Sequence, residues 1–285
     1  MALFLSFSIL NIADMTTDGA FVLGSAVSAM VCLAGHPILA LPAGMLAAAA
    51  AGFITAFLQT KLSVPSILAG IVTNIGLYSI NLMVMGKSNQ SLFMVPSIYT
   101  MADEAGIGGS WHKLIVTAVI VLVLCVLLVL FLGTRLGLSI RATGDNTDMV
   151  RASSINPSFT ITVGLCLSNS LTGLAGCLIG LLNKSCDINL GTGMVTVALA
   201  SLIIGESLMG RGSIPRRVFG VILGACLYRI IIAVAISTSI VPTEGFKLVS
   251  ALIVAVAIAA PQGRKLIALQ RQKLAAKKRG GGVKC

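Results

Sequence analysis

The sequence has few of the residues that build active sites, metal sites or nucleotide-binding loops. It contains no GxxxxGK[ST] loop, no GxSxG elbow and no HExxH pair, which argues against an ATPase, a serine hydrolase and a zinc protease. Its two histidines, His36 and His112, are distant in the chain, and its 7 cysteines form no CxxC pair. We therefore expect no catalytic residue, no metal and no cofactor, and any coupled ATP hydrolysis must belong to a partner.

Charged residues are also scarce. They make up 10% of the 285 residues, whereas 56% are hydrophobic and the mean hydropathy is +1.01. A soluble domain carries about 25% charged residues. Apolar runs recur along the chain, which predicts an all-α, polytopic membrane bundle of roughly 8 spans of about 20 residues, with broken or re-entrant helices. We expect one transmembrane domain over residues 1–263 and a basic cytoplasmic tail over residues 264–285.

The net charge of +11 raises the question of nucleic-acid binding, but the positions of the basic residues argue against it. Eight of the 20 lysines and arginines lie in the tail, and no acidic residue follows Glu244. Basic residues at the cytoplasmic end of membrane spans follow the positive-inside rule and bind anionic lipid headgroups. The sequence therefore predicts contact with membrane lipid and none with nucleic acid.

Several polar residues interrupt the apolar runs and are candidates for lining a solute pathway. Two acids between short apolar stretches near the N-terminus indicate a broken helix, which needs protein or a water-filled cavity around it. Two asparagines seven residues apart share one face of a later span, and a D-x-N-x-G-x-G pattern follows in the second half. Capping of the next helix by the first acid, and helix-to-helix hydrogen bonds by the asparagines, are the structural alternatives. These candidates are Asp14, Asp18, Asn74, Asn81, Asp187 and Asn189.

Two other charged residues lie within or beside spans. Glu206 is followed by three arginines, and an ion pair at the membrane interface explains it better than a functional carboxylate does. Arg229 lies within an apolar run and should have an acidic partner or a polar cavity. Its candidate partners are Asp14, Asp18 and Asp187.

The longest polar stretch between two apolar runs covers residues 134–156, within a loop that we take as cytoplasmic. Gly144 can turn the chain there, and Asp145 stands where a helix N-cap is expected. Residues 146–153 then form about two helical turns, with Asp148 near the positive end of the helix dipole and Met149 on one face. A short capped helix between two spans is suited to passing force to a protein outside the membrane.

Three stretches resemble one family, the permease subunits of bacterial ABC importers of the branched-chain amino acid and ribose type. GTRLGLSIRATGDNTDMVRASSIN resembles the cytoplasmic coupling loop of that family, which sits in a groove of the ATPase subunit. Ile188–Gly212 resembles its GxG, apolar helix and GGxSLxGGxG segment, and Leu10–Gly24 resembles the element after its first span. The three stretches occur in the family's order. The form DMTTDG is most similar to the aromatic amino acid branch, assigned to tryptophan and tyrosine.

The resemblance implies a permease subunit that moves a small solute, an amino acid, by alternating access across the bacterial plasma (inner) membrane. It implies four kinds of partner: a cytoplasmic ABC ATPase subunit, an extracytoplasmic solute-binding protein, a second permease in a homodimer or heterodimer, and membrane lipid. The coupling loop covers residues 134–157. The residues that the resemblance assigns to ATPase coupling are Arg141, Gly144, Asp145, Asn146, Asp148, Met149 and Arg151.

Two other functions are compatible with the residues alone. An ion-driven secondary transporter would use Asp14, Asp18 or Glu206 as its ion site, and a membrane scaffold would transport nothing. A sugar or a nucleoside is the alternative solute. Transport that needs the ATPase but survives an uncoupler separates an ABC importer from a secondary transporter.

Overall fold

The structure is a computed structural model that describes residues 1–104, 106, 109–210, 212–237, 251 and 255. It divides into two compact units, Met1–Val195 and Thr196–Cys285, each of which is described by itself. The basic tail lies outside the described residues, as does the expected last span over residues 246–260 except for residues 251 and 255.

The described chain is built of helices, with one small antiparallel sheet, and this confirms the predicted all-α membrane bundle. Five described helices are long and apolar enough to cross a membrane, and two more apolar helices are shorter. In chain order the elements are η1 (Phe4–Ile9), α1 (Thr17–Leu33), α2 (Pro37–Thr60), α3 (Ser66–Met85), β1 (Asn89–Ser91), α4 (Ile98–Glu104), η2 (Gly109–Trp111), α5 (His112–Gly133), α6 (Arg135–Asp145), α7 (Thr147–Ala152), α8 (Pro157–Asn183), β2 (Ser185–Asp187), α9 (Met194–Met209) and α10 (Ile214–Ser237).

Local sequence signals mark several of the helix ends in the first unit. The side-chain oxygen of Asn156 accepts a hydrogen bond from Ser158 N at 3.0 Å, and Pro157 is the first residue of α8. The hydroxyl of Thr134 accepts from Gly137 N at 3.2 Å and caps α6. Gly86 ends α3 with a left-handed φ of 69°, a conformation that glycine adopts without steric cost.

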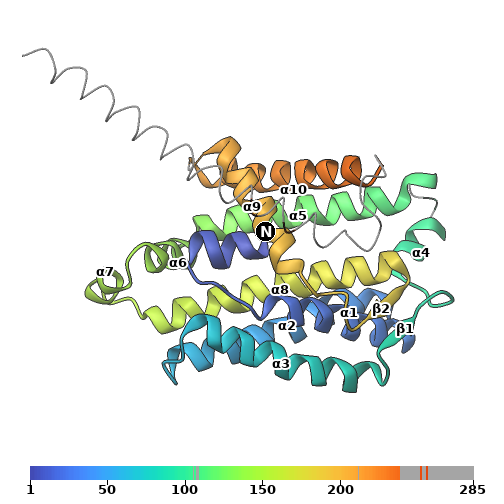
Figure 1. Cartoon of the computed structure of the whole chain (residues 1–285), viewed down its shortest axis with the longest axis horizontal. Helices are drawn as coiled ribbons and strands as arrows, with labels where there is room; N and C mark the ends of the chain where they lie inside the picture. Colours follow the sequence, from blue (N-terminus) through green and yellow to red (C-terminus); the bar gives the residue numbers. More distant parts are fainter. Residues whose placement is uncertain (105, 107–108, 211, 238–250, 252–254, 256–285) are drawn as a thin grey trace, which may run out of the picture. The chain divides into compact units, whose positions relative to one another are not determined.

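The centre of the first unit is the packing of α1 and α2 against α8 (Figure 1). Small residues allow the backbones to touch: a side chain at Gly24 would collide with the backbone of Gly173, and one at Gly176 would collide with Phe21 O. A side chain at Gly44 of α2 would collide with the sulfur of Cys177 and approach the backbone oxygen of Gly24. Close backbone contact replaces the hydrophobic effect as the packing force between helices in lipid. The stripe of small residues in α2 therefore holds the bundle together.

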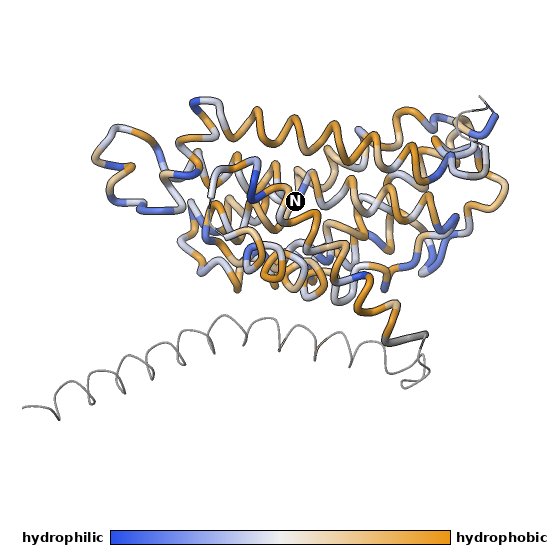
Figure 2. The backbone as a smooth tube through the Cα atoms, turned by 90° about the horizontal axis from the view of Figure 1, so that it is seen from above, coloured by the Kyte–Doolittle hydropathy of each residue, from blue (hydrophilic) through white to orange (hydrophobic). Residues whose placement is uncertain are grey.

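Polar segments gather at the two ends of the first unit. At one end β1 pairs antiparallel with β2, with Gln90 opposite Cys186, so that two loops predicted to face outward lie together. The other end carries α6 and α7 (Figure 1), and Figure 2 shows hydrophilic residues concentrated there and at the sheet, with hydrophobic residues between them. The coupling loop and the sheet thus lie at opposite ends of the unit, and the assignment of the coupling loop to the inside and the sheet to the outside stays a prediction.

The second unit contains most of α9 and the whole of α10. Tyr228 is buried in a cluster with Ala200 and other apolar residues of these two helices. The carboxylate of Glu206 binds the guanidinium of Arg217 at 2.9 Å, which confirms the predicted ion pair. Arg229 is exposed on α10.

Candidate functional site

The first candidate region is the break between η1 and α1, where the chain passes through the bundle without helical hydrogen bonds. We call Leu10–Thr16 the link segment. Asp14 lies within it and is only 2% exposed. One carboxylate oxygen accepts from Thr16 N at 2.9 Å, and the other accepts from Asn169 Nδ2 of α8 at 2.7 Å. The predicted broken helix is therefore present. Asp14 binds the backbone just before α1 and connects it to α8 by a hydrogen bond.

The link segment is fixed to three other helices besides α1. The hydroxyls of Thr16 and Thr55 are 2.7 Å apart, which joins it to α2. Gly70 of α3 packs directly against Met15, and Gly164 of α8 packs against the side chain of Leu10. These contacts bury Asp14 and Thr16, whereas Asn11 near the start of the segment is exposed. Protein therefore surrounds part of this irregular backbone, as the membrane interior requires.

Asp18, in the first turn of α1, faces a pocket in the first unit. Its two carboxylate oxygens accept from Gly193 N at 3.2 Å and Val195 N at 2.9 Å, at the start of α9. None of the described cations lies within ion-pair distance of it. The carboxylate is thus held by backbone amides and keeps further acceptor sites, since each carboxylate has about four lone-pair positions.

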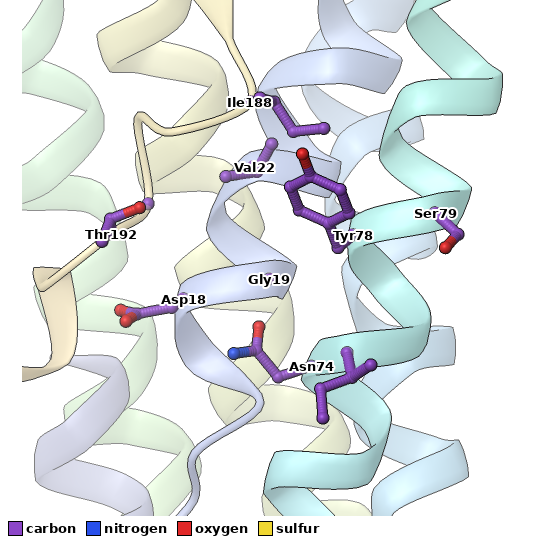
Figure 3. Close-up of a pocket in the computed structure, with 10 residues that line it drawn as sticks. Asp18, Gly19, Val22, Asn74, Tyr78, Ser79, Ile188 and Thr192 are labelled. Atoms are coloured by element: carbon purple, nitrogen blue, oxygen red, sulfur yellow. The ribbon is translucent and has the colours of Figure 1, made fainter. Parts of the chain in front are cut away.

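We call this cavity the interior pocket, and its volume is about 390 Å³. Asn74 and Tyr78 reach toward it from α3, opposite Asp18 and Thr192, while Val22 and Ile188 supply apolar wall (Figure 3). Asn74 lies so close to Gly19 that a side chain on Gly19 would collide with the amide oxygen. The full lining is Asp18, Gly19, Val22, Asn74, Ile75, Tyr78, Ser79, Ile188, Gly191 and Thr192.

Two of the six predicted pathway residues, Asp18 and Asn74, meet at this pocket. Asn81 is buried and donates to Gly19 O at 3.2 Å, so it acts as the predicted helix-to-helix hydrogen bond. Asp187 accepts from Asn189 N at 2.7 Å and closes a local turn, and Asn189 is exposed. The pocket lining includes none of Asp14, Asn81, Asp187 and Asn189.

Sequence reasoning missed Tyr78 and Thr192 as pocket residues. A signal for Tyr78 was present, because it lies four residues after Asn74 and therefore on the same face of α3. Thr192 belongs to the loop that was predicted to contribute through Asp187 and Asn189, but that loop reaches the pocket through other residues.

The second candidate region is the coupling loop, and the structure corrects its predicted details. Gly144 does not turn the chain, because it is the last residue but one of α6. Asp145 is not the N-cap, because it completes α6; the side-chain oxygen of Asn146 accepts from Asp148 N at 3.0 Å and Met149 N at 3.1 Å. The capped helix is α7, within one residue of the predicted bounds.

The side chains of the coupling loop divide into a buried face and an exposed face. Val150 is 1% exposed and packs inward, whereas Met149 is 53% exposed. Asp145, Asn146, Asp148 and Arg151 are exposed, and Arg141 is half-buried. An exposed methionine on a short capped helix is available to a partner, and methionine adapts to irregular surfaces.

The coupling loop is attached to the bundle at two points. The hydroxyls of Thr143 and Thr160 are 2.8 Å apart, which joins α6 to α8. A side chain at Gly144 would collide with Ile9 O, so α6 lies directly against the end of η1 and the link segment. The same stretch of chain therefore contacts the coupling loop at one end and leads to Asp18 at the other.

The three acids predicted as partners of Arg229, which are Asp14, Asp18 and Asp187, all lie in the first unit, and the pairing stays a prediction. Each of the carboxylates binds amide groups in the first unit. Arg229 is exposed on α10 in the second unit.

Comparison with known proteins decides the family. A family model described as the branched-chain amino acid transport system / permease component matches residues 1–258. The chain belongs to this permease family. It is a multi-pass membrane protein and a component of a transporter rather than an enzyme, which confirms the resemblance drawn from its three motifs.

Two relatives cover most of the permease. A "Tyrosine transport system permease protein" of Clostridioides difficile (strain R20291) is 30% identical over 255 residues, which are 89% of this chain and 83% of that protein. An uncharacterised protein of Rickettsia prowazekii (strain Madrid E) is 30% identical over 248 residues, 85% of each chain. No solved structure matches the permease.

Proposed function

We propose that this permease is the membrane subunit of an ATP-driven importer that works by alternating access. A cytoplasmic ABC ATPase subunit binds the exposed face of α7, and its closure on ATP moves the coupling loop. The observation that carries the proposal is the link segment, since it touches α6 through Gly144 and runs to Asp18 at the interior pocket. Movement of the coupling loop is thereby passed to the groups that hold the solute.

The solute of this proposal is an amino acid, and an aromatic one fits the pocket best. Asp18 would bind the ammonium group, Asn74 would bind the carboxylate, and Tyr78 would stack on the ring. A volume of about 390 Å³ is within the range of small-molecule sites. The name of the relative from Clostridioides difficile, which mentions tyrosine, supports the same solute class.

The proposed assembly contains further partners. The exposed surface of α3 carries two polar side chains, Tyr78 and Ser79. Polar side chains of a span face protein or a water-filled cavity rather than lipid, so we place a second permease copy, identical or closely related, over this side. An extracytoplasmic solute-binding protein delivers the solute at the end that carries β1 and β2. Lipid covers the exposed apolar residues of α5, such as Leu122 and Leu130.

The test is uptake of labelled tyrosine, phenylalanine and tryptophan into vesicles that contain the permease, its ATPase subunit and its binding protein. Uptake should require ATP and survive an uncoupler. Uptake that an uncoupler abolishes would instead establish an ion-coupled secondary transporter. Ribose and a nucleoside serve as competing solutes, and inhibition by either in place of the amino acids would reassign the solute class.

A further inference from the structure

A second pocket lies at the coupling loop, and no role has been assigned to it so far. Its volume is about 390 Å³, and it opens between the start of the link segment and the junction of α6 with α7. We call it the coupling pocket. Its lining is Leu10, Asn11, Ile12, Thr143, Gly144, Asp145, Asn146, Thr147 and Ile161.

The coupling pocket has an apolar wall and a single acidic group. Leu10, Ile12 and Ile161 form the wall, and Asp145 is the one carboxylate among the lining residues. In the described part of the chain, the side chain of Asp145 makes neither an ion pair nor a hydrogen bond. The amide oxygen of the neighbouring Asn146 is already occupied, because it accepts from two backbone N–H groups of α7.

We propose that the coupling pocket receives a lysine or arginine side chain of the ATPase subunit. This inference rests on the proposed function. It adds the chemical class of the ATPase side chain and the pocket of the permease that this side chain contacts. Lysine and arginine combine an apolar stem with a charged end, so the stem lies along the three apolar residues and the charge meets Asp145. The loop also contains Asp148 and three arginines, Arg135, Arg141 and Arg151, and no described arginine forms an ion pair with Asp145.

The position of the pocket gives the occupant a mechanical effect. One wall belongs to the link segment and the other to the end of α6, which touch at Leu10 and Gly144. A side chain seated between them is in contact with both. When the ATPase moves, this side chain displaces the link segment directly, in addition to the force that α7 transmits through Met149.

The probe is the ATPase subunit that co-purifies with the wild-type permease. Its affinity for full-length permease variants in nanodiscs is measured at several salt concentrations. Asp145→Asn should weaken binding about tenfold at low salt, as expected for the loss of one partly desolvated ion pair, and Asp145→Lys should weaken it more. Both variants should show a smaller dependence of affinity on salt. Glu104→Gln removes an exposed carboxylate at the opposite end of the first unit, on α4, and should bind like wild type.

A second variant tests the cavity independently of the charge. Ile161→Trp keeps Asp145 and fills the pocket with a bulky side chain, and it should weaken binding to a similar extent. Thermal unfolding of each variant shows whether it is folded.

A permease that ends at Gly263 lacks the chain's own basic tail. The effect of Asp145→Asn should persist in it, and disappearance of the effect would assign the pocket to the tail and overturn the proposal.

The outcomes distinguish a failure of the coupling-pocket contact from a failure of the proposed importer function. If the wild-type permease binds the ATPase and Asp145→Asn binds it equally well with the same salt dependence, the coupling pocket is not the contact, and the importer function stands. If no ABC ATPase binds the wild-type permease under any condition, the proposed function itself fails.

Discussion

Asp18 and Asp145 are both carboxylates at the edge of a pocket, yet their surroundings differ in a way that separates the two sites. Asp18 is held by two backbone amides at the start of α9, at 2.9 and 3.2 Å, so its position is set before any solute arrives. Asp145 is exposed and has no bonded partner in the described part of the chain. The fold of this chain therefore sets the position of Asp18, whereas in our proposal another protein completes the coupling pocket.

The difference has a thermodynamic consequence. Removing an acceptor that satisfies buried amides costs stability even without solute, because the amides are left unpaired. Removing an exposed, unpaired carboxylate costs the isolated permease almost nothing, because surface charges contribute little to folding. Variants at Asp18 should therefore lower the stability of the isolated permease, whereas variants at Asp145 should leave it almost unchanged.

The largest effect is expected from Asp18→Ala. Loss of the ion pair with the ammonium group of the solute costs about 2–5 kcal/mol, so uptake should fall at least about 30-fold. The two amides of Gly193 and Val195 also lose their acceptor, which should lower the stability of the purified permease by about 1–3 kcal/mol. Solute uptake and thermal unfolding in detergent measure the two effects. Asp145→Ala is the matched change, and an equal loss of stability in that variant would remove the distinction between the two sites.

Gly144→Ala should disturb the contact between the coupling loop and the link segment. The added methyl group collides with Ile9 O, and overpacking of this kind costs about 1–3 kcal/mol. We expect less solute moved per ATP hydrolysed, with the ATPase still bound. Gly133→Ala is the control, because a side chain at Gly133 meets nothing within 4 Å. Equal coupling ratios in the two variants would show that the Gly144 contact does not transmit motion.

Tyr78→Leu tests whether the interior pocket recognises an aromatic ring. An aromatic pair is worth about 0.5–1.5 kcal/mol, so the apparent KM for tyrosine should rise about 2- to 10-fold, while the KM for an aliphatic amino acid changes less. Tyr78→Phe keeps the ring and should retain most of the affinity. A Tyr78→Leu permease that transports tyrosine with an unchanged KM would place the ring of the solute elsewhere.

The smallest effect on transport is expected from the basic tail, which lies outside the described residues. Replacing Lys273, Lys277, Lys278 and Arg279 by glutamine removes about 1 kcal/mol of attraction to anionic lipid per residue. Binding of the tail to vesicles with anionic lipid should weaken, and uptake should be largely preserved. Loss of uptake with normal insertion would give the tail a role in the mechanism.

The sequence predicted the short helix α7 well because its signals are local. A capping residue, a first-turn acid and a proline before the next span are enough to locate α7 within one residue. The cap moved from Asp145 to Asn146 because both residue types cap helices, and only the observed length of α6 shows which of them does so. The helix α6 itself was missed, although Leu136, Ile140 and Thr143 have helical spacing.

The interior pocket was predicted only in part, because it is made by contacts between distant segments. Polar residues within apolar runs pointed to Asp18 and Asn74, but the same rule also selected Asn81 and Asp187, which satisfy hydrogen bonds of the fold. The sequence does not show which polar group a neighbouring helix will satisfy. Tyr78 was missed because an aromatic residue in a span is ordinarily a packing residue.

The most direct test of the account compares Met149→Glu with wild type in ATP-driven tyrosine uptake, alongside co-purification of the ATPase subunit. Met149 is 53% exposed on α7, and burying an unpaired charge in the groove of the ATPase is costly. The control is Met94→Glu, since Met94 is 99% exposed in the loop that follows β1 at the other end of the first unit. We predict normal membrane insertion for both variants, with ATPase binding lost in Met149→Glu and kept in Met94→Glu, and with uptake lost in Met149→Glu. Full ATPase binding and full uptake by Met149→Glu would contradict the account, because α7 would then not be the contact that drives transport.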